Sequence, residues 1–173
     1  MRREVKLSTI YIRIVIICIP FVFLFTSYSF SKSRAIAKYE KAIVRCFNKN
    51  DAAGLKALFC DELSSKYEHL NGEILAGMDL IKGKIVHYKR TSNRDSAAKA
   101  GGHVYYAYIT PMLENVVTDT GDEYTINFGF YLANDKMPST VGLLFIQIID
   151  KDHNSLITIG SGIDANGELR RLI

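Results

Sequence analysis

The spacing of apolar residues along the chain changes close to residue 84. Before this point apolar side chains recur every three or four residues, which is typical of amphipathic helices. After it they tend to alternate with polar ones, which is typical of half-buried strands. Helices followed by antiparallel strands predict the α+β fold class, in which the N-terminal helices pack on one face of the sheet.

Three helices are predicted in the first part of the chain. Asn50 and Asp51 supply an N-cap for the second helix, and Gly83 is suited to the end of the third. The predicted helices cover residues 34–48, a short segment that follows Asp51 and carries Leu55, Leu58 and Phe59, and a longer segment from residue 61 or 62 to Ile81.

Strands are predicted in the second part, where the alternation is most regular between Tyr124 and Ala133. The second strand is expected to bend or break at Pro111, and residues 119–122 are expected to form a hairpin turn. Residues 89–102 are polar and predict a connection without strand structure. The predicted strands cover residues 85–88, 103–110 with a resumption at 112–117, 124–133, 141–149 and 156–159, with further turns at 151–154 and 166–167.

The N-terminal segment has basic, then apolar, then small residues, an order that is typical of a secretory signal peptide. Residues 14–25 contain no charged side chain, and as a helix they reach about 18 Å, which is short of a hydrocarbon core of about 30 Å. The alternative is an uncleaved N-terminal membrane anchor with its basic end inside. Both interpretations predict a leader over residues 1–30, one domain over residues 31–173, and an extracytoplasmic location, either secreted or anchored to the plasma membrane.

The net charge of +4 belongs mostly to the leader. Residues 1–29 hold four basic side chains and Glu4, a balance of +3, which leaves 18 basic and 17 acidic side chains in residues 30–173. A nearly neutral domain lacks the basic face that displaces counterions from nucleic acid. Nucleic acid is therefore not expected as a partner.

The sequence offers few residues suited to catalysis or to metal binding. The four histidines lack metal-ligand spacing, the motif Gly-x-Ser-x-Gly is absent, and most acidic residues outside the helices fall at expected turns, with Glu114 as the exception. Cys46 and Cys60 either pair as a disulfide or remain buried thiols. We therefore expect no enzyme, no cofactor and no metal site.

A local excess of basic side chains follows the third predicted helix. One interpretation is contact with an anionic ligand, a lipid headgroup or a wall polymer. The other, which we favour, is protection of an edge strand against pairing with a second sheet. The cluster consists of Lys82, Lys84, Lys89, Arg90 and Arg94.

Tyrosine and asparagine side chains on the predicted strands form the candidate ligand-binding site. Such groups suit a ligand that has a polar tip and an apolar body. The alternative is that they form the solvated face of a half-buried sheet. The candidate residues are Tyr88, Tyr106, Tyr108, Asn127 and Tyr131.

Several short motifs are spread over residues 35–150. They are Ala57-Leu58-Phe59, Ile81-Lys82-Gly83 with Ile85 and Tyr88, Thr120 to Tyr124 with Ile126 and Phe128, and the run from Asn134 through Pro138 and Gly142 to Ile146. In these motifs the chain resembles an uncharacterised family of secreted or membrane-tethered bacterial proteins with a cystatin-like (nuclear transport factor 2-like) domain. The resemblance implies a curved antiparallel sheet wrapped on a long helix. The family has no assigned activity, so the resemblance implies no functional residues.

These features together predict a non-catalytic ligand-binding or interaction module of the bacterial cell envelope. Its expected partners are an envelope ligand or protein, and the membrane if residues 1–30 remain attached. One alternative is a small-substrate isomerase or lyase that uses the cavity of the cystatin-like fold. The other is an assembly module whose open sheet face forms a homodimer.

Overall fold

The computed structural model describes residues 29, 31–151, 155–163 and 169–170. The chain divides into two units at Ala37, and the larger unit, residues 38–173, carries the sheet. The predicted leader and the predicted turns at 151–154 and 166–167 lie wholly or largely outside the described residues. Within the described part of the chain, no helix has the length and apolar character that crossing a membrane requires.

Helices occupy the first part of the larger unit, as the spacing predicts. Residues 31–49 are helical, with the boundary between the units inside this first helix. It is followed by α2 (Ala52–Lys56), α3 (Asp61–Lys66) and α4 (Leu70–Leu80). The predicted N-cap is confirmed, because the Asp51 carboxylate accepts a hydrogen bond of 2.8 Å from the Gly54 backbone N–H.

The prediction of one continuous helix from residue 61 or 62 to Ile81 is wrong. The chain leaves the helical conformation at Tyr67, whose φ of −88° and ψ of 98° are extended. The Tyr67 hydroxyl donates to Glu73 of α4 over 2.9 Å, and Leu63 and Leu70 on either side are both buried. The apolar spacing continues through this break because both short helices bury side chains in the same core, so the spacing alone cannot reveal it.

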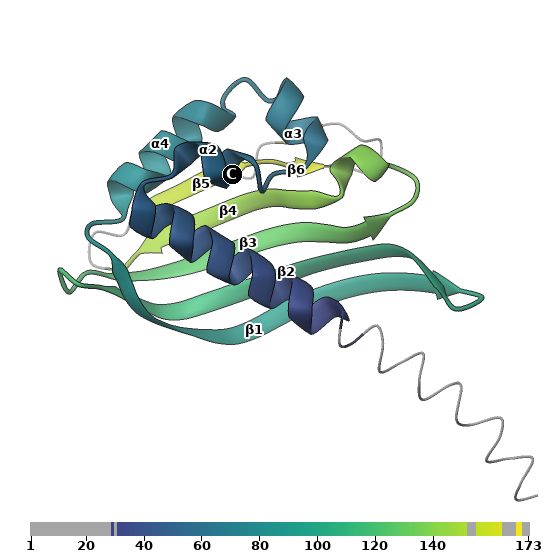
Figure 1. Ribbon diagram of the computed structural model, residues 1–173, viewed down its shortest axis with the longest axis horizontal. Helices are drawn as coiled ribbons and strands as arrows, with labels where there is room; N and C mark the ends of the chain where they lie inside the picture. Colours follow the sequence, from purple (N-terminus) through teal and green to yellow (C-terminus); the bar gives the residue numbers. More distant parts are fainter. Residues whose placement is uncertain (1–28, 30, 152–154, 164–168, 171–173) are drawn as a thin grey trace, which may run out of the picture. The chain divides into compact units, whose positions relative to one another are not determined.

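The strands form one antiparallel sheet in the order β1-β2-β3-β4-β5, so the protein belongs to the α+β class (Figure 1). A separate two-stranded sheet pairs β6 (Gly162–Ile163) with β7 (Leu169–Arg170), and a short 3-10 helix, η1 (Pro138–Thr140), precedes β4. The five main strands are β1 (Ile85–Ala100), β2 (His103–Thr118), β3 (Glu123–Asn134), β4 (Gly142–Asp150) and β5 (Leu156–Gly160).

The first two strands are longer than predicted. Residues 89–100 continue β1 and pair with β2 as far as Ala100↔His103. Their polar composition hides the strand, because the side chains of this edge strand are largely exposed and need no apolar alternation. β2 also continues through Pro111, which is paired with Asn93 of β1. On its other side β2 pairs with β3 both before and after the proline, through Ile109 and Met112. The expected break at Pro111 is therefore wrong.

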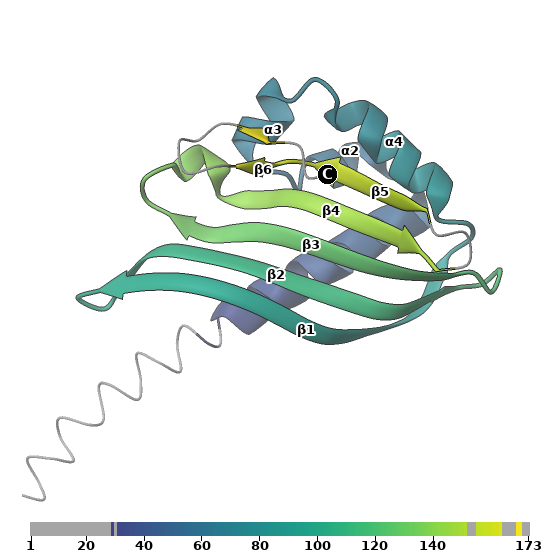
Figure 2. The same ribbon diagram turned by 180° about the vertical axis from the view of Figure 1, so that it is seen from behind.

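One face of the sheet carries the core and is covered by helices (Figure 1). The ring of Tyr39, on the first helix, lies 4.5 Å from that of Phe130 on β3. On α4, a side chain at Gly77 would meet Ile159 of β5 and Ile148 of β4, so the helix packs closely on these strands. We call this side the covered face. Figure 2 shows the opposite side, the open face, over which no helix of the described residues lies.

Side-chain hydrogen bonds join the helices to the sheet. The Asn48 amide, at the end of the first helix, accepts from the Ile85 backbone N–H (2.7 Å) and donates to the Ile85 carbonyl (3.0 Å). The Tyr124 hydroxyl of β3 donates to the Leu80 carbonyl and accepts from the Lys82 N–H, both over 3.1 Å. These bonds fix the ends of the first helix and of α4 against β1 and β3.

The two described cysteines, Cys46 and Cys60, are free thiols and are buried. Burial raises the pKa of each thiol, which disfavours the reactive thiolate. Of the two alternatives that the sequence left open, the structure therefore has the buried thiols.

Replacement of Gly160 tests the packing at the end of β5. This glycine has φ +86°, and an added Cβ would collide with the Leu144 carbonyl and the Phe59 ring. We expect Gly160→Ala to lower the free energy of unfolding by about 2 kcal/mol or more. Gly72→Ala is the control, because this site in α4 has nothing within 4 Å, and we expect a gain of about 0.5–1 kcal/mol. Urea denaturation of both variants measures the difference, and equal effects would contradict this packing.

Candidate functional site

Four of the five predicted ligand-binding residues lie on the open face. Directly paired residues of an antiparallel sheet point to the same side, and Tyr108 of β2 pairs with Tyr131 of β3. Tyr106 and Asn127 have the same alternation on these strands. The alternation of the sequence therefore predicted correctly that these four side chains share one face.

Three of these residues form a tyrosine cluster, made of Tyr106, Tyr108 and Tyr131. The Tyr131 ring lies 5.4 Å from the Tyr106 ring and 5.2 Å from the Tyr108 ring, between centroids. These are favourable distances for tilted and edge-to-face aromatic pairs. Tyr131 is only 8% exposed, whereas Tyr106 and Tyr108 are half-buried. The cluster therefore has a buried centre and two partly exposed neighbours.

A glycine allows a fourth ring to join the cluster from β4. Gly129 of β3 pairs with Phe145, and a Cβ at Gly129 would collide with the Phe145 ring and approach the Tyr108 hydroxyl to 2.9 Å. The missing side chain at Gly129 therefore makes the space in which these two rings lie. Sequence reasoning missed both Gly129 and Phe145.

The pKa values of two hydroxyls of the cluster, those of Tyr131 and Tyr108, are raised, which favours their neutral form. Burial, followed by a hydrogen bond with the Tyr106 hydroxyl, strongly raises the pKa of Tyr131. Burial also raises the pKa of Tyr108, against the opposing effect of a hydrogen bond with Thr110. Tyr131 and Tyr108 therefore carry neutral hydroxyl groups, which can both donate and accept hydrogen bonds.

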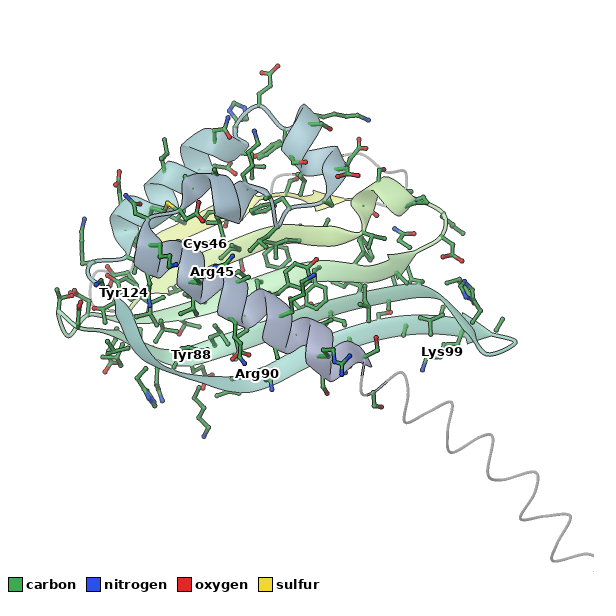
Figure 3. The ribbon with its side chains drawn as sticks, in the orientation of Figure 1. Arg45, Cys46, Tyr88, Arg90, Lys99 and Tyr124 are labelled. Carbon is green, nitrogen blue, oxygen red and sulfur yellow. The ribbon has the colours of Figure 1, made fainter. Side chains whose placement is uncertain are left out.

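The fifth predicted residue, Tyr88, does not belong to this cluster. Its environment is set by Glu40 of the first helix, so it lies on the covered side of β1 (Figure 3). Burial and the neighbouring Glu40 carboxylate raise the pKa of Tyr88. The same Glu40 accepts from Arg90, two residues further along β1, at 3.2 Å. The structure therefore separates Tyr88 from Tyr106, Tyr108 and Tyr131.

Beside the tyrosine cluster, two amide side chains form an amide pair on the open face. Asn127 of β3 is paired directly with Gln147 of β4, and both are half-buried. Their neighbours in the same row across the sheet are Met112 of β2 and Thr158 of β5. Sequence reasoning missed Gln147, because the other residues of β4 before Asp150 are apolar on both faces. The signal that could have identified Gln147 is that it is the single amide in an otherwise apolar run.

Charged side chains lie around the tyrosine cluster and the amide pair. On the β1 side, Arg94 pairs with Thr110, and Lys89 pairs with Glu114. Ion pairs mark the two ends of the strands: His103 with Asp135 at 2.7 Å, and Lys151 with Glu123 at 3.7 Å. Across β2 to β5, the row of residues that contains the amide pair has no charged member.

The other candidate groups do not gather into a site. Glu114, the one acidic residue expected on a strand, is half-buried and lies opposite Lys89. Within the part of the chain that the structure describes, no three His, Cys, Asp or Glu side chains come together in a way that could hold a metal ion. Of the basic cluster, Arg90 is bound to Glu40, and the basic residues on either side of it, Lys89 and Arg94, are exposed along β1.

The fold and the site define an α+β domain with an aromatic and amide-bearing surface on its uncovered sheet face. Residues 42–151 match the family of the DUF5104 domain of unknown function, and the chain belongs to this family. The matched region includes the tyrosine cluster and the amide pair. No curated protein matches the sequence. The expectation of an uncharacterised family is thereby confirmed.

The raised pKa of Tyr131 predicts a loss of stability at high pH. The unfolded chain ionises its tyrosines near pH 10, before Tyr131 ionises in the folded state, so the unfolded state then binds fewer protons and stability falls as the pH rises above about 10. We expect Tyr131→Phe to lose less of its free energy of unfolding between about pH 8 and about pH 11. Tyr105→Phe, at an exposed tyrosine of the same strand as Tyr106, is the control. Equal pH slopes in all three proteins would contradict the assignment.

Proposed function

We infer that the protein is a non-catalytic module that binds a ligand of the bacterial cell envelope on its open sheet face. The observation that carries this proposal is the tyrosine cluster. Tyr106 and Tyr108 keep part of their surface exposed on a face that no described helix covers. Aromatic rings with a polar hydroxyl suit ligands that are apolar on one side and polar on the other.

A cystatin-like arrangement is part of the same proposal. Three features support it: the helix that lies against β3 through Tyr39, the sequential antiparallel order of five strands, and the register shifts along β1 and β2 that bend a sheet. In this proposal the helices occupy the inner side of the sheet, so the ligand binds outside and not in a cavity beneath the helices.

A thermal-shift experiment tests ligand binding on the open face. The probes are cellohexaose, a chitin hexamer, oleate, glycerol phosphate and the dipeptide alanyl-alanine. We expect at least one probe in large excess to raise the melting temperature by about 2 °C or more. Tyr106→Ala and Tyr108→Ala should remove this shift, because each deletes a partly exposed ring of the cluster.

Tyr105→Ala is the matched control for these variants. Tyr105 is 40% exposed and, as the neighbour of Tyr106, it points to the other side of the strand, so the shift should persist. The proposal fails if no probe stabilises the protein, or if Tyr105→Ala removes the shift as effectively as Tyr106→Ala. If a higher protein concentration alone raises the melting temperature, and Tyr106→Ala removes this increase, the result would instead favour the homodimer alternative.

We also propose that the domain lies outside the cytoplasm, on the basis of the basic and apolar pattern of residues 1–30. Expression of the full chain in a bacterial host, followed by mass spectrometry of the purified protein, tests the fate of this leader. A new N-terminus close to residue 30 in an exported fraction is expected if a signal peptidase cleaves it. An intact chain in the membrane fraction supports the anchor, and an intact chain in the cytosol contradicts both forms.

A further inference from the structure

We propose that the ligand of the open face is a neutral, hydroxyl-rich glycan chain, which the amide pair recognises by hydrogen bonds while the tyrosine cluster supports the sugar rings. This inference rests on the proposed function, and it adds the chemical class of the ligand. It is carried by the amide pair, the lack of charge in its row and the adjacent aromatic surface.

The amide pair has hydrogen-bonding capacity that the fold does not use. Within the described part of the chain, neither the Asn127 nor the Gln147 side chain forms a hydrogen bond. Other amides of this domain are used: Asn48 brackets Ile85, and Asn134 donates to Thr140 over 2.9 Å. An amide offers two donors and one acceptor oxygen. Two such groups side by side can therefore hold vicinal hydroxyl groups, each of which both donates and accepts.

The absence of charge in this row excludes other ligand classes. The row runs from Met112 through Asn127 and Gln147 to Thr158. A phosphate or carboxylate ligand would be recognised by arginine or lysine, yet Arg94 and Lys89 lie outside the row, on β1. Peptides and lipids with charged groups therefore find no counter-ion beside the amides, whereas a neutral polyol needs none.

The tyrosine cluster supplies the apolar half of a sugar site. One side of a pyranose ring presents C–H groups, which pack on the face of an aromatic ring, and the ring's hydroxyl groups extend from its rim. Tyr108 and Phe145 approach each other over Gly129, which precedes Phe130 and lies two residues from Asn127 on the same strand. Successive same-face residues along a strand are about 6.8 Å apart, which places the aromatic and amide groups within the reach of adjoining sugar units.

Calorimetric titration of the purified full chain with cellohexaose, maltohexaose and a chitin hexamer tests the proposal. We expect at least one of these neutral hexasaccharides to bind, with an affinity that added NaCl leaves unchanged, because salt screens only charges. Asn127→Ala and Gln147→Met should each weaken the affinity about three- to tenfold. Asn127→Ser, a smaller change, provides a second variant should Asn127→Ala disturb the strand, and it should weaken binding in the same direction.

Two control variants separate this recognition from other causes. Asn71→Ala removes an exposed amide on α4, and Arg94→Ala removes an exposed cation on β1; both should keep the wild-type affinity. If no hexasaccharide binds but oleate, glycerol phosphate or alanyl-alanine stabilises the protein through Tyr106 and Tyr108, the glycan proposal fails and the proposed function stands. Binding that NaCl and Arg94→Ala both weaken would also overturn it, and a lack of binding by every probe would overturn both proposals.

Discussion

The register between β3 and β4 is the constraint on which the rest of this structure depends. It places Phe128 opposite Ile146 and Ile126 opposite Ile148, so that these four buried apolar side chains lie together on the covered face. A shift of β4 by one residue against β3 would turn Ile146 and Ile148 outward and bring Gln147 into the core, because side chains alternate between the two faces. The same pairing that buries the core therefore also assembles the polar row on the other side.

The two faces of the sheet differ in what their side chains contribute to the fold. Stability comes from the covered face, where Tyr39 meets Phe130 and α4 approaches Ile148 and Ile159 through Gly77. The open face contributes less buried apolar surface to the core, so its side chains can be polar. Tyr131 lies on the open face but is buried, so it contributes to stability as well as forming the centre of the tyrosine cluster.

The sequence predicted the parts of the fold that depend on alternation alone. β3, β4 and β5 lie within one residue of the predicted bounds, and Tyr106, Tyr108, Asn127 and Tyr131 could be placed on one face by counting along the strands. Counting failed where the register shifts. Two shifts between Ile85 and Lys89 interrupt the alternation of β1, and Tyr88 consequently lies with Glu40 on the covered side. Gln147 was missed for another reason: it lies in an apolar run, and only the register of β3 against β4 brings it beside Asn127.

The hydrogen bonds at the beginning of β1 have a consequence for how this strand opens. The Asn48 amide holds both backbone groups of Ile85, and Lys84 exchanges two hydrogen bonds with Asp119 beside it. At the other end, the turn at Gly101 and Gly102 is exposed, and the His103 side chain beside it is joined to Asp135, beyond the end of β3, at 2.7 Å between exposed groups. Fraying of the hairpin therefore starts at its tip and stops at its base, so backbone amides near Ala100 exchange with solvent deuterium much sooner than that of Ile85.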